Sequence, residues 1–372
     1  MSNPLLENHE LPPFSRIRPD HVEPAIRELI ERNRHAIDEL LATSDRYTWD
    51  NLLRPIEALD DALSRAWSPV THLNSVLNSD ALREAYNRCL PLLSEYGTWM
   101  NQHAGLYTAY KQIADSDGFA ALDEAQRTTI DHALRDFGLA GVALPAEEKQ
   151  RYGDLQRRLS ENGSRFAENV LDATNGWSRP ATAEELAGLP ATALANARQA
   201  AEQAGRQGYL ITLDFPSYHA VLTYCDNAAL RNEVYTAYCT RASEQGPDAG
   251  RWDNAGLLIE TLDLRRELAS LLGFESYAAL SLETKMAESP EQVVDFLRQL
   301  AWQSLPQARA DRQALADFAR DEYGVASLAA WDVGYYSEKL RHSRYQVSQE
   351  DVRPWLPVDR VLNGLFEVCL LY

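Results

Sequence analysis

The stretch "SPEQVVDFLRQLA", residues 289–301, carries clear signals of a helix start. Ser289 is a strong N-cap residue, because its hydroxyl can accept a hydrogen bond from a free N–H group of the first turn. Pro290 suits the first helical position, and Gln292 completes the pattern of a capping box. The stretch therefore predicts an amphipathic helix, an element that builds cores far more often than sites.

Three longer stretches repeat this pattern, at residues 18–41, 48–67 and 145–174. Asp20 is the candidate N-cap of the first, with Glu23 as its capping-box partner, and Pro145 marks the start of the third. Their apolar residues recur at helical spacing. These residues are Val22, Ile26, Leu29, Ala36 and Leu40, then Leu52, Ile56, Leu59 and Leu63, then Tyr152, Leu155, Leu159, Phe166 and Val170, with Gly163 filling a gap.

One stretch differs from the helices around it: "GYLITLDFPSY", residues 208–218. It alternates, it is rich in β-branched and aromatic residues, and Pro216 ends the pattern. We expect a short strand or hairpin arm there, and a change of structural unit between about residues 175 and 220. The predicted fold is mostly α, with one short β element near 208–216.

Composition and charge restrict the classes of partner. The 372 residues hold 36 Lys and Arg against 55 Asp and Glu, a net charge of −19. Nucleic acids and anionic membrane surfaces need clustered basic residues, so neither is expected as a partner. The four cysteines form no C-x-x-C pair, and no run approaches the 18 apolar residues of a membrane span. The start lacks a signal-peptide pattern, and we expect a reduced, cytoplasmic protein.

The histidines have no spacing typical of a metal site. A zinc site on one helix needs two imidazoles at i and i+4, and no pair of the eight histidines has that spacing. "NHELPPF", residues 8–14, begins like H-E-x-x-H but has proline at position 13. His35 with Glu31 or Glu39, and His132 with Asp136, are better explained as surface ion pairs. Phosphate-binding glycine motifs and a G-x-S-x-G elbow are also absent from the sequence.

The stretch "VLNGLFEVCLLY", residues 361–372, is apolar nearly all round when read as a helix. Such a helix belongs inside a protein. If its packing partners are missing, the side chains should be unusually exposed or folded back on a surface. The residues concerned are Val361, Leu362, Leu365, Phe366, Val368, Leu370 and Leu371.

Several blocks resemble the thimet oligopeptidase family of zinc metallopeptidases. They include "RASEQGPDAGRWDN" (241–254), "LRRELASLLGFESYAALSLETKMAESPEQVVDFL" (264–297), "WDVGYYSEKLR" (331–341) and "VLNGLFEV" (361–368). Upstream, "LPPFSRIRPDHVEPAI", "DFGLAGVALP", "RFAENVLDAT" and "LDFPSY" follow in the family's order. The resemblance covers nearly the whole chain.

The family resemblance implies a multi-helical lobe of a two-lobed, clam-like enzyme whose channel admits short peptides. It implies a zinc ion held by H-E-x-x-H and a later glutamate, with the motif glutamate as general base. The expected domains are an N-terminal helical lobe at 1–180, a helix with a short strand or hairpin at 181–225, and the start of the catalytic domain at 226–372. The family's zinc motif lies beyond "GLFEV", so we expect the chain to stop before the zinc site.

No catalytic or metal-binding residue is therefore carried over from the family, and no zinc is expected on this chain. The resemblance implies short peptides and a missing C-terminal catalytic part as partners. In "WDVGYYSEK", residues 331–339, the cluster of Tyr335, Tyr336 and Lys339 suggests a wall of the substrate channel, or else a packed loop that fixes the fold. The leading hypothesis is the N-terminal part of a zinc oligopeptidase, inactive alone. The alternatives are a non-catalytic helical module that binds peptides or acts as a scaffold, and one half of a split enzyme.

Overall fold

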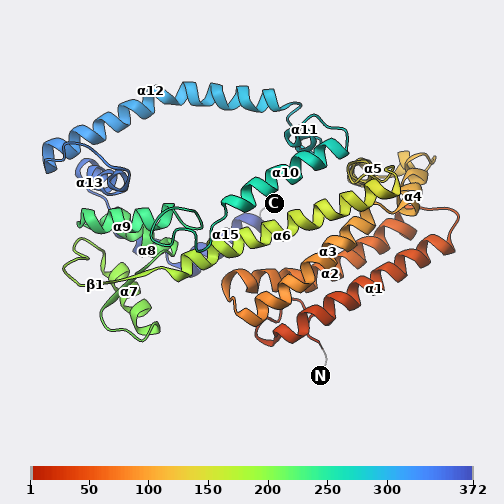
Figure 1. Ribbon diagram of the computed structural model, residues 1–372, viewed down its shortest axis with the longest axis horizontal. Coiled ribbons are helices and arrows are strands. Elements are labelled where there is room, and N and C mark those ends of the chain that lie inside the picture. Colours follow the sequence, from red (N-terminus) through yellow and green to blue (C-terminus); the bar gives the residue numbers. More distant parts are fainter. Residues whose placement is uncertain (1–2, 371–372) are drawn as a thin grey trace. The chain divides into compact units, whose positions relative to one another are not determined.

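The computed structural model describes residues 3–370, apart from the side chain of Gln349. The chain is built almost wholly of helices (Figure 1). One small antiparallel sheet joins β1 (Ser178–Ala181) to β2 (Tyr209–Thr212), with Ser178 opposite Thr212. The mostly α fold with one short β element is confirmed.

The chain forms two compact units. The first takes the residues up to Arg165 together with Leu257–Met286, and the second takes Phe166–Gly256 together with the residues from Ala287 onward. The division expected from the sequence, with boundaries near 180 and 225, stays a prediction.

The first unit is all helical. Its long helices are amphipathic and bury their apolar faces against one another, which removes apolar surface from water. The elements are η1 (Phe14–Arg16), α1 (Pro19–Thr43), η2 (Trp49–Leu53), α2 (Arg54–Val76), α3 (Asp80–Asn101), α4 (Ala104–Ala114), η3 (Phe119–Ala121), α5 (Glu124–Leu139), most of α6 (Ala146–Gly176) and α10 (Ala255–Leu271), and α11 (Tyr277–Leu282).

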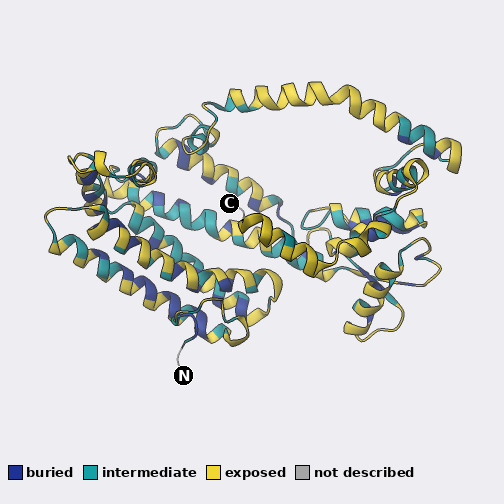
Figure 2. Cartoon of the chain, turned by 180° about the vertical axis from the view of Figure 1, so that it is seen from behind, coloured by how far each residue is buried: buried dark blue, intermediate teal, exposed yellow. Residues whose placement is uncertain are grey.

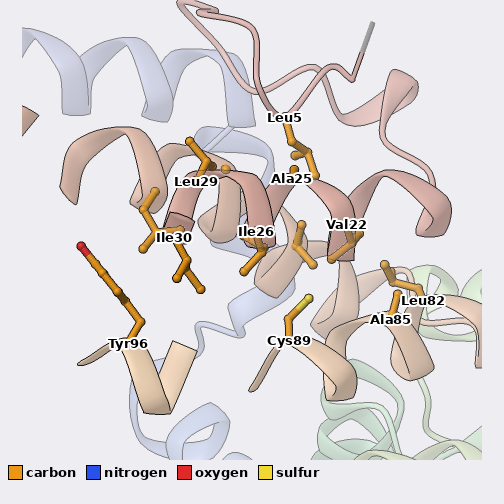
Figure 3. Close-up of a cluster of buried hydrophobic side chains, with 13 residues drawn as sticks. Leu5, Val22, Ala25, Ile26, Leu29, Ile30, Leu82, Ala85, Cys89 and Tyr96 are labelled. Carbon is orange, nitrogen blue, oxygen red and sulfur yellow. The ribbon is translucent and has the colours of Figure 1, made fainter. Parts of the chain in front are cut away.

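The core of the first unit lies where α1 packs against α2 and α3 (Figure 3). Val22 and Ile26 of α1 are fully buried there, as is Cys89 of α3. The polar side chain of Asn33 is also buried on α1, and its amide donates to the Leu59 carbonyl at 3.2 Å. Most of the apolar stripe predicted for residues 18–41 is therefore core, as its spacing indicates.

The second unit holds the sheet and the remaining helices. Its elements are the end of α6, β1, α7 (Ala191–Gln203), β2, α8 (Phe215–Tyr224), α9 (Ala228–Cys239), α12 (Pro290–Tyr323), η4 (Ala330–Asp332), α13 (Val333–Tyr345), α14 (Gln349–Val352), η5 (Arg353–Trp355) and α15 (Val358–Leu370). A second apolar core forms around the sheet, α8 and α9, with Val221, Leu230 and Val234 almost fully buried.

The helix starts test the capping predictions. Ser289 caps α12 as predicted, since its hydroxyl accepts from the Gln292 N–H at 3.2 Å. The Gln292 side chain accepts from the N–H of Glu288, one residue earlier than a capping box requires. Asp20 is not the cap of α1, which begins at Pro19 with Arg18 in the cap position. Proline has no N–H to satisfy, so it occupies the first helical position and moves the start forward.

The strand is shorter than predicted. β2 ends at Thr212, and Pro216 lies in the first turn of α8 rather than at the end of the strand. The turn is held locally, because the Thr212 N–H donates to the Ser217 hydroxyl at 3.1 Å. A proline preceded by an extended segment opens a helix as readily as it stops a strand.

Two helices of the second unit, α12 and α15, are largely exposed to solvent (Figure 2). The exposure predicted for the apolar side chains after residue 360 is confirmed for six of them, while Leu371 lies outside the described residues. They are Val361, Leu362, Leu365, Phe366, Val368 and Leu370, with exposed fractions from 45% to 84%. None of the helices within residues 3–370 has the length and apolarity needed to cross a bilayer.

Candidate functional site

A buried arginine organises the segment that the sequence singled out. Arg231 of α9 is 1% exposed. Its Nη1 donates to the Cys225 carbonyl at 2.6 Å, and its Nη2 donates to Oδ1 of Asp332 at 2.7 Å. Its Nε finds no hydrogen-bond partner among the described residues. A buried charge is tolerated only when it is paired and hydrogen-bonded, so α9 and η4 are held together here.

Asp332 is the matching anion. The residue is 8% exposed, and both of its carboxylate oxygens accept hydrogen bonds. Oδ1 accepts from Arg231, while Oδ2 accepts from the Ala329 N–H at 3.2 Å. The second bond caps η4 and fixes the carboxylate, so the chain presents Asp332 to the guanidinium in one orientation.

Two tyrosines cover the guanidinium. The Cζ atom of Arg231 lies 4.1 Å from the ring centroid of Tyr335 and 6.0 Å from that of Tyr336. The two rings meet edge to face, with centroids 5.0 Å apart. Both residues are buried, and desolvation raises the pKa of each phenol. A cation over a desolvated aromatic face gains electrostatic stabilisation from the ring.

Arg231, Asp332, Tyr335 and Tyr336 form one cluster, here called the Arg231 cluster, and its outer edge is polar. The Tyr335 hydroxyl donates to Oδ1 of Asp226 at 2.7 Å, and Lys339 Nζ lies 3.6 Å from the same oxygen. Nζ also lies 4.9 Å from the centroid of the Tyr335 ring. The Lys339 side chain is 34% exposed and that of Asp226 is 49% exposed. These two charges are therefore the accessible part of the cluster, while the tyrosines are its buried support.

The close approach of α13 to α8 requires a glycine. A Cβ built on Gly334 would lie 3.2 Å from the Leu222 carbonyl oxygen, tighter than ordinary van der Waals contact. Gly334 thus lets α13 sit against the backbone of α8, which brings Tyr335 to Asp226.

The segment at residues 331–339 is not a loop. It is the short helix η4 followed by the first half of α13. The structure brings Tyr335, Tyr336 and Lys339 together, and Asp332 of the same segment joins them. It adds Arg231 and Asp226, which the sequence did not indicate. Of the other residues in this segment, Trp331 packs near Tyr235, and Glu338 pairs with Arg341 instead of joining the cluster. The role of the three predicted residues in a substrate channel stays a prediction.

Metal ligands do not gather in the described part of the chain. Within residues 3–370, no three His, Cys, Asp or Glu side chains come together as a ligand set. His35 Nδ1 instead lies 3.7 Å from the Glu39 carboxylate with both side chains exposed, as predicted for a surface pair. His103 caps α4, with Nδ1 accepting from the Leu106 N–H at 3.1 Å. The residues present do not fit a zinc site, and no zinc-dependent step is derived from them.

A pocket of about 380 Å³ lies in the second unit, among α7, β2, α8 and the segment that holds Glu350 and Arg353. Its charges compensate one another, because Arg353 Nη1 lies 3.1 Å from Glu350 and donates to the Thr192 hydroxyl at 3.1 Å. A larger pocket of about 720 Å³ lies in the first unit, between the N-terminal segment and α1 and α2. Neither pocket is lined by Tyr335, Tyr336 or Lys339.

The helical fold and two family models define the class. Residues 221–370, which contain the whole Arg231 cluster, match the model of peptidase family M3. Residues 26–149 match the N-terminal domain of neurolysin and thimet oligopeptidase. The chain is therefore similar to peptidase family M3 over residues 221–370 and to the N-terminal domain of neurolysin and thimet oligopeptidase over residues 26–149.

The chain is also similar to oligopeptidase A. It is 54% identical over 369 residues to oligopeptidase A of Escherichia coli, covering 99% of this chain and 54% of that protein. Identity is 53% over 369 residues to oligopeptidase A of Haemophilus influenzae, with the same two coverages. It is 34% over 378 residues to a probable cytosolic oligopeptidase A of Arabidopsis thaliana, covering 98% of this chain and 52% of that protein. The chain therefore spans about half the length of the curated relatives that it matches.

Proposed function

We propose that this chain is the N-terminal portion of a cytoplasmic, zinc-dependent oligopeptidase that hydrolyses short peptides. The observation that carries the proposal is the 54% identity over 99% of the chain to a protein named oligopeptidase A. A relative named as a probable cytosolic oligopeptidase A supports the cytoplasmic placement.

The chain alone is proposed to be inactive. Amide hydrolysis by this chemistry needs a metal to activate water and a base to take its proton. The sequence holds no histidine pair at i and i+4 spacing, and the described residues gather no ligand set. Zinc, implied by the family, would then be bound by residues outside the set described here.

The test is hydrolysis of a quenched fluorescent peptide of about ten residues by the purified chain. We expect no turnover above the buffer rate, with or without added zinc. The positive control is full-length E. coli oligopeptidase A. Chelator-sensitive cleavage that co-elutes with this chain would contradict the proposal.

The contribution of the Arg231 cluster is proposed to be recognition of the peptide backbone. Lys339 and Asp226 offer an accessible ammonium and an accessible carboxylate, 3.6 Å apart. A peptide bond presents one acceptor and one donor, which such a pair can engage. Tyr335 and Tyr336 are buried, so their part is to position Lys339 rather than to contact the peptide.

Fluorescence anisotropy of a labelled pentapeptide tests this role. Lys339→Met removes the ammonium and keeps the stem, and it should weaken peptide binding by about tenfold, a change worth about 1.4 kcal/mol. Lys285→Met, on a lysine outside the cluster, is the matched control and should bind like the parent. Equal binding by both variants would assign the cluster to packing alone.

A further inference from the structure

The pocket of about 380 Å³ in the second unit has the lining of a binding site. Its apolar lining includes Ala197, Leu210 and Ile211, each at most 7% exposed. Charged side chains, among them Asp214 and Arg353, also line it. Ligand pockets of roughly 300–1,000 Å³ typically combine an apolar lining with a few well-placed polar groups. The proposed function leaves this pocket unused.

The pocket lies on the β2 side of the sheet. Leu210, Ile211 and Thr212 of β2 line it, whereas none of the described lining residues belongs to β1. In an antiparallel pair, the N–H and C=O groups of successive residues point alternately toward the partner strand and away from it. The Thr212 N–H points away, because it donates to the Ser217 hydroxyl of α8 at 3.1 Å. The backbone groups of Leu210, two residues earlier, therefore also point away from β1.

Pro180 indicates the same orientation. It stands opposite Leu210 in the register and has no N–H to donate. Its carbonyl oxygen accepts from Nη1 of Arg179 at 2.7 Å. Within residues 3–370, no side chain and no residue outside the sheet forms a hydrogen bond with the Leu210 N–H or C=O. β2 thus presents a free donor and a free acceptor to the pocket, the groups by which a sheet edge binds an added strand.

The charged groups of the pocket lie toward its two ends. Asp214 directly precedes α8, and Tyr224 is the last of the 10 residues of this helix, which span about 15 Å. Burial raises the pKa of the Tyr224 phenol, and the charge of Arg353 is among those that lower it, so Arg353 lies near the Tyr224 end. An extended peptide of about four residues has a similar length, at roughly 3.3 Å per residue.

Both charged groups are accessible to a ligand. The Arg353 side chain is 60% exposed and lies 3.1 Å from Glu350. An exposed ion pair contributes at most about 1 kcal/mol, so a ligand carboxylate can share the guanidinium at little cost. Asp214 is exposed and accepts from the Thr212 hydroxyl at 3.2 Å. The pocket therefore complements a ligand that carries one free ammonium and one free carboxylate.

We propose that this pocket binds a short free peptide of about four residues in extended conformation, as an added strand on the outer edge of β2. One residue of the peptide pairs with Leu210 through both of its backbone groups. The peptide carboxylate pairs with Arg353 and its ammonium pairs with Asp214. The small side chain of Ala193, on the α7 wall of the pocket, leaves room for the side chains of the peptide.

Recognition of this kind uses the backbone and the two ends of the peptide, so it tolerates many peptide sequences. The site does not include the Arg231 cluster, because Arg231, Asp332, Tyr335 and Tyr336 are not among the residues that line the pocket. The proposal therefore does not depend on the proposed function.

The first experiment is isothermal titration calorimetry of the full chain with tetra-alanine. The free peptide should bind. Tetra-alanine that is acetylated at its N-terminus and amidated at its C-terminus should bind at least about tenfold more weakly, because both charges are removed. A single N-methyl group removes one backbone donor. At least one of the two peptides N-methylated at the second or third residue should lose about tenfold in affinity.

Substitutions test where the peptide binds. Ala193→Leu fills the pocket from α7 and should weaken binding of tetra-alanine by at least about tenfold. Ala195→Leu is the matched control, on an exposed part of the same helix outside the pocket lining, and should bind like the parent. Far-ultraviolet circular dichroism and thermal unfolding check that both leucine variants are folded.

Arg353→Met keeps the stem of the side chain and removes the charge. It should weaken binding of free tetra-alanine and leave binding of the C-amidated peptide unchanged, since that peptide has no carboxylate to lose. Arg206→Met, on an exposed arginine of the same unit outside the pocket lining, is the matched control and should bind both peptides like the parent.

The proposal is overturned if tetra-alanine does not bind, or if the free and doubly capped peptides bind equally. Equal weakening by Ala193→Leu and Ala195→Leu also overturns it. Loss of binding in Lys339→Met, with Arg353→Met unaffected, would assign the peptide to the Arg231 cluster instead of the pocket. These outcomes are separate from those of the proposed function. Cleavage of a peptide by the chain alone defeats the function and leaves the pocket proposal standing.

Discussion

Arg231 and Asp332 lie 101 residues apart in the sequence, yet they share a 2.7 Å hydrogen bond in the interior of the second unit. The arginine side chain is 1% exposed and the aspartate side chain is 11% exposed. This pair, covered by the Tyr335 ring, ties α9 to the start of α13. The geometry of the candidate site depends on it.

Removing one partner of this pair should destabilise the second unit strongly. Asp332→Ala leaves the Arg231 guanidinium buried without its counter-charge, a change that typically costs about 3–5 kcal/mol. Urea unfolding followed by tryptophan fluorescence measures the loss. The double substitution Arg231→Met and Asp332→Leu should cost less than Asp332→Ala alone, because no charge remains uncompensated.

A surface pair provides the control for that experiment. Arg320 Nη1 lies 2.7 Å from Asp317, with side chains 55% and 42% exposed. Asp317→Ala should cost no more than about 1 kcal/mol, because exposed ion pairs contribute little. Equal losses for Asp332→Ala and Asp317→Ala would show that burial does not strengthen the Arg231 pair.

Acid should lower the stability of the region around β1, because Glu185 becomes protonated there. The bidentate hydrogen bonds from Arg179 and the bond from the Thr182 N–H lower the pKa of Glu185 from 4.5 to about 2. A carboxyl whose pKa falls on folding adds stability above its unfolded pKa, and this is lost as the pH drops from 4.5 toward 2. Glu185→Gln should therefore be less stable than the parent at pH 7, with the difference vanishing near pH 2.

Urea titrations at several pH values measure that difference. Glu202→Gln, at an exposed position of α7, is the control and should follow the parent over the whole range. A constant difference between Glu185→Gln and the parent from pH 7 to pH 2 would contradict the assignment.

The four cysteines should react in two classes. Cys89 and Cys225 are buried, and burial raises the pKa of Cys89 to about 11 and also raises that of Cys225. Cys239 and Cys369 are exposed. Only the thiolate attacks, so an aromatic disulfide reagent at pH 8 should modify the exposed pair quickly and the buried pair only on unfolding. Peptide mapping after a short pulse identifies the modified residues, and early labelling of Cys89 would refute the prediction.

Gly188 should tolerate no side chain. It has φ = +89°, and a Cβ there would collide with the Tyr224 carbonyl oxygen and come within 2.7 Å of Oδ1 of Asp226. Gly188→Ala should therefore lower stability by more than the roughly 1–2 kcal/mol of a left-handed alanine. Gly205→Ala is the matched control, with φ = +66° and open space around its Cβ, so it should cost only that backbone strain. Thermal unfolding compares the two, and equal losses would contradict the steric argument.

The exposed face of α15 should make the isolated chain prone to aggregate. Large apolar side chains left in water forfeit roughly 1.5–3 kcal/mol each relative to full burial, and association recovers part of it. Removing the residues from Val361 onward should lower light scattering and binding of an apolar dye at equal protein concentration. Unchanged scattering after this removal would show that α15 is not responsible.

Local signals predicted much of the helical framework. Ser289 caps α12, and Pro145 lies just before the first residue of α6. Both are helix-start signals that depend only on neighbouring residues, so they could be found from the sequence. β1 could not be found this way. Its residues, Ser178–Ala181, include a proline and have no strand pattern, and they form a strand only because β2 pairs with them.

The candidate site was predicted only in part. Tyr335, Tyr336 and Lys339 stand together in the sequence, so their grouping was visible. Arg231 is a charged residue in a polar-looking stretch, "DNAALRNEVY", where a surface position is the ordinary expectation. Its burial follows from Asp332, and no local pattern reports a partner 101 residues away.

The buried ion pair of Arg231 and Asp332 also limits which substitutions the gene can accumulate. Substitution of Arg231 or Asp332 alone leaves the other charge buried without its partner. A lineage with only one of the two substitutions would therefore carry a destabilised protein. Homologous genes should therefore vary at the two codons together or at neither. Strains with apolar residues at both positions would have passed through a destabilised intermediate that carried only one of the two substitutions. The exposed residues Arg320 and Asp317 can be substituted independently of each other.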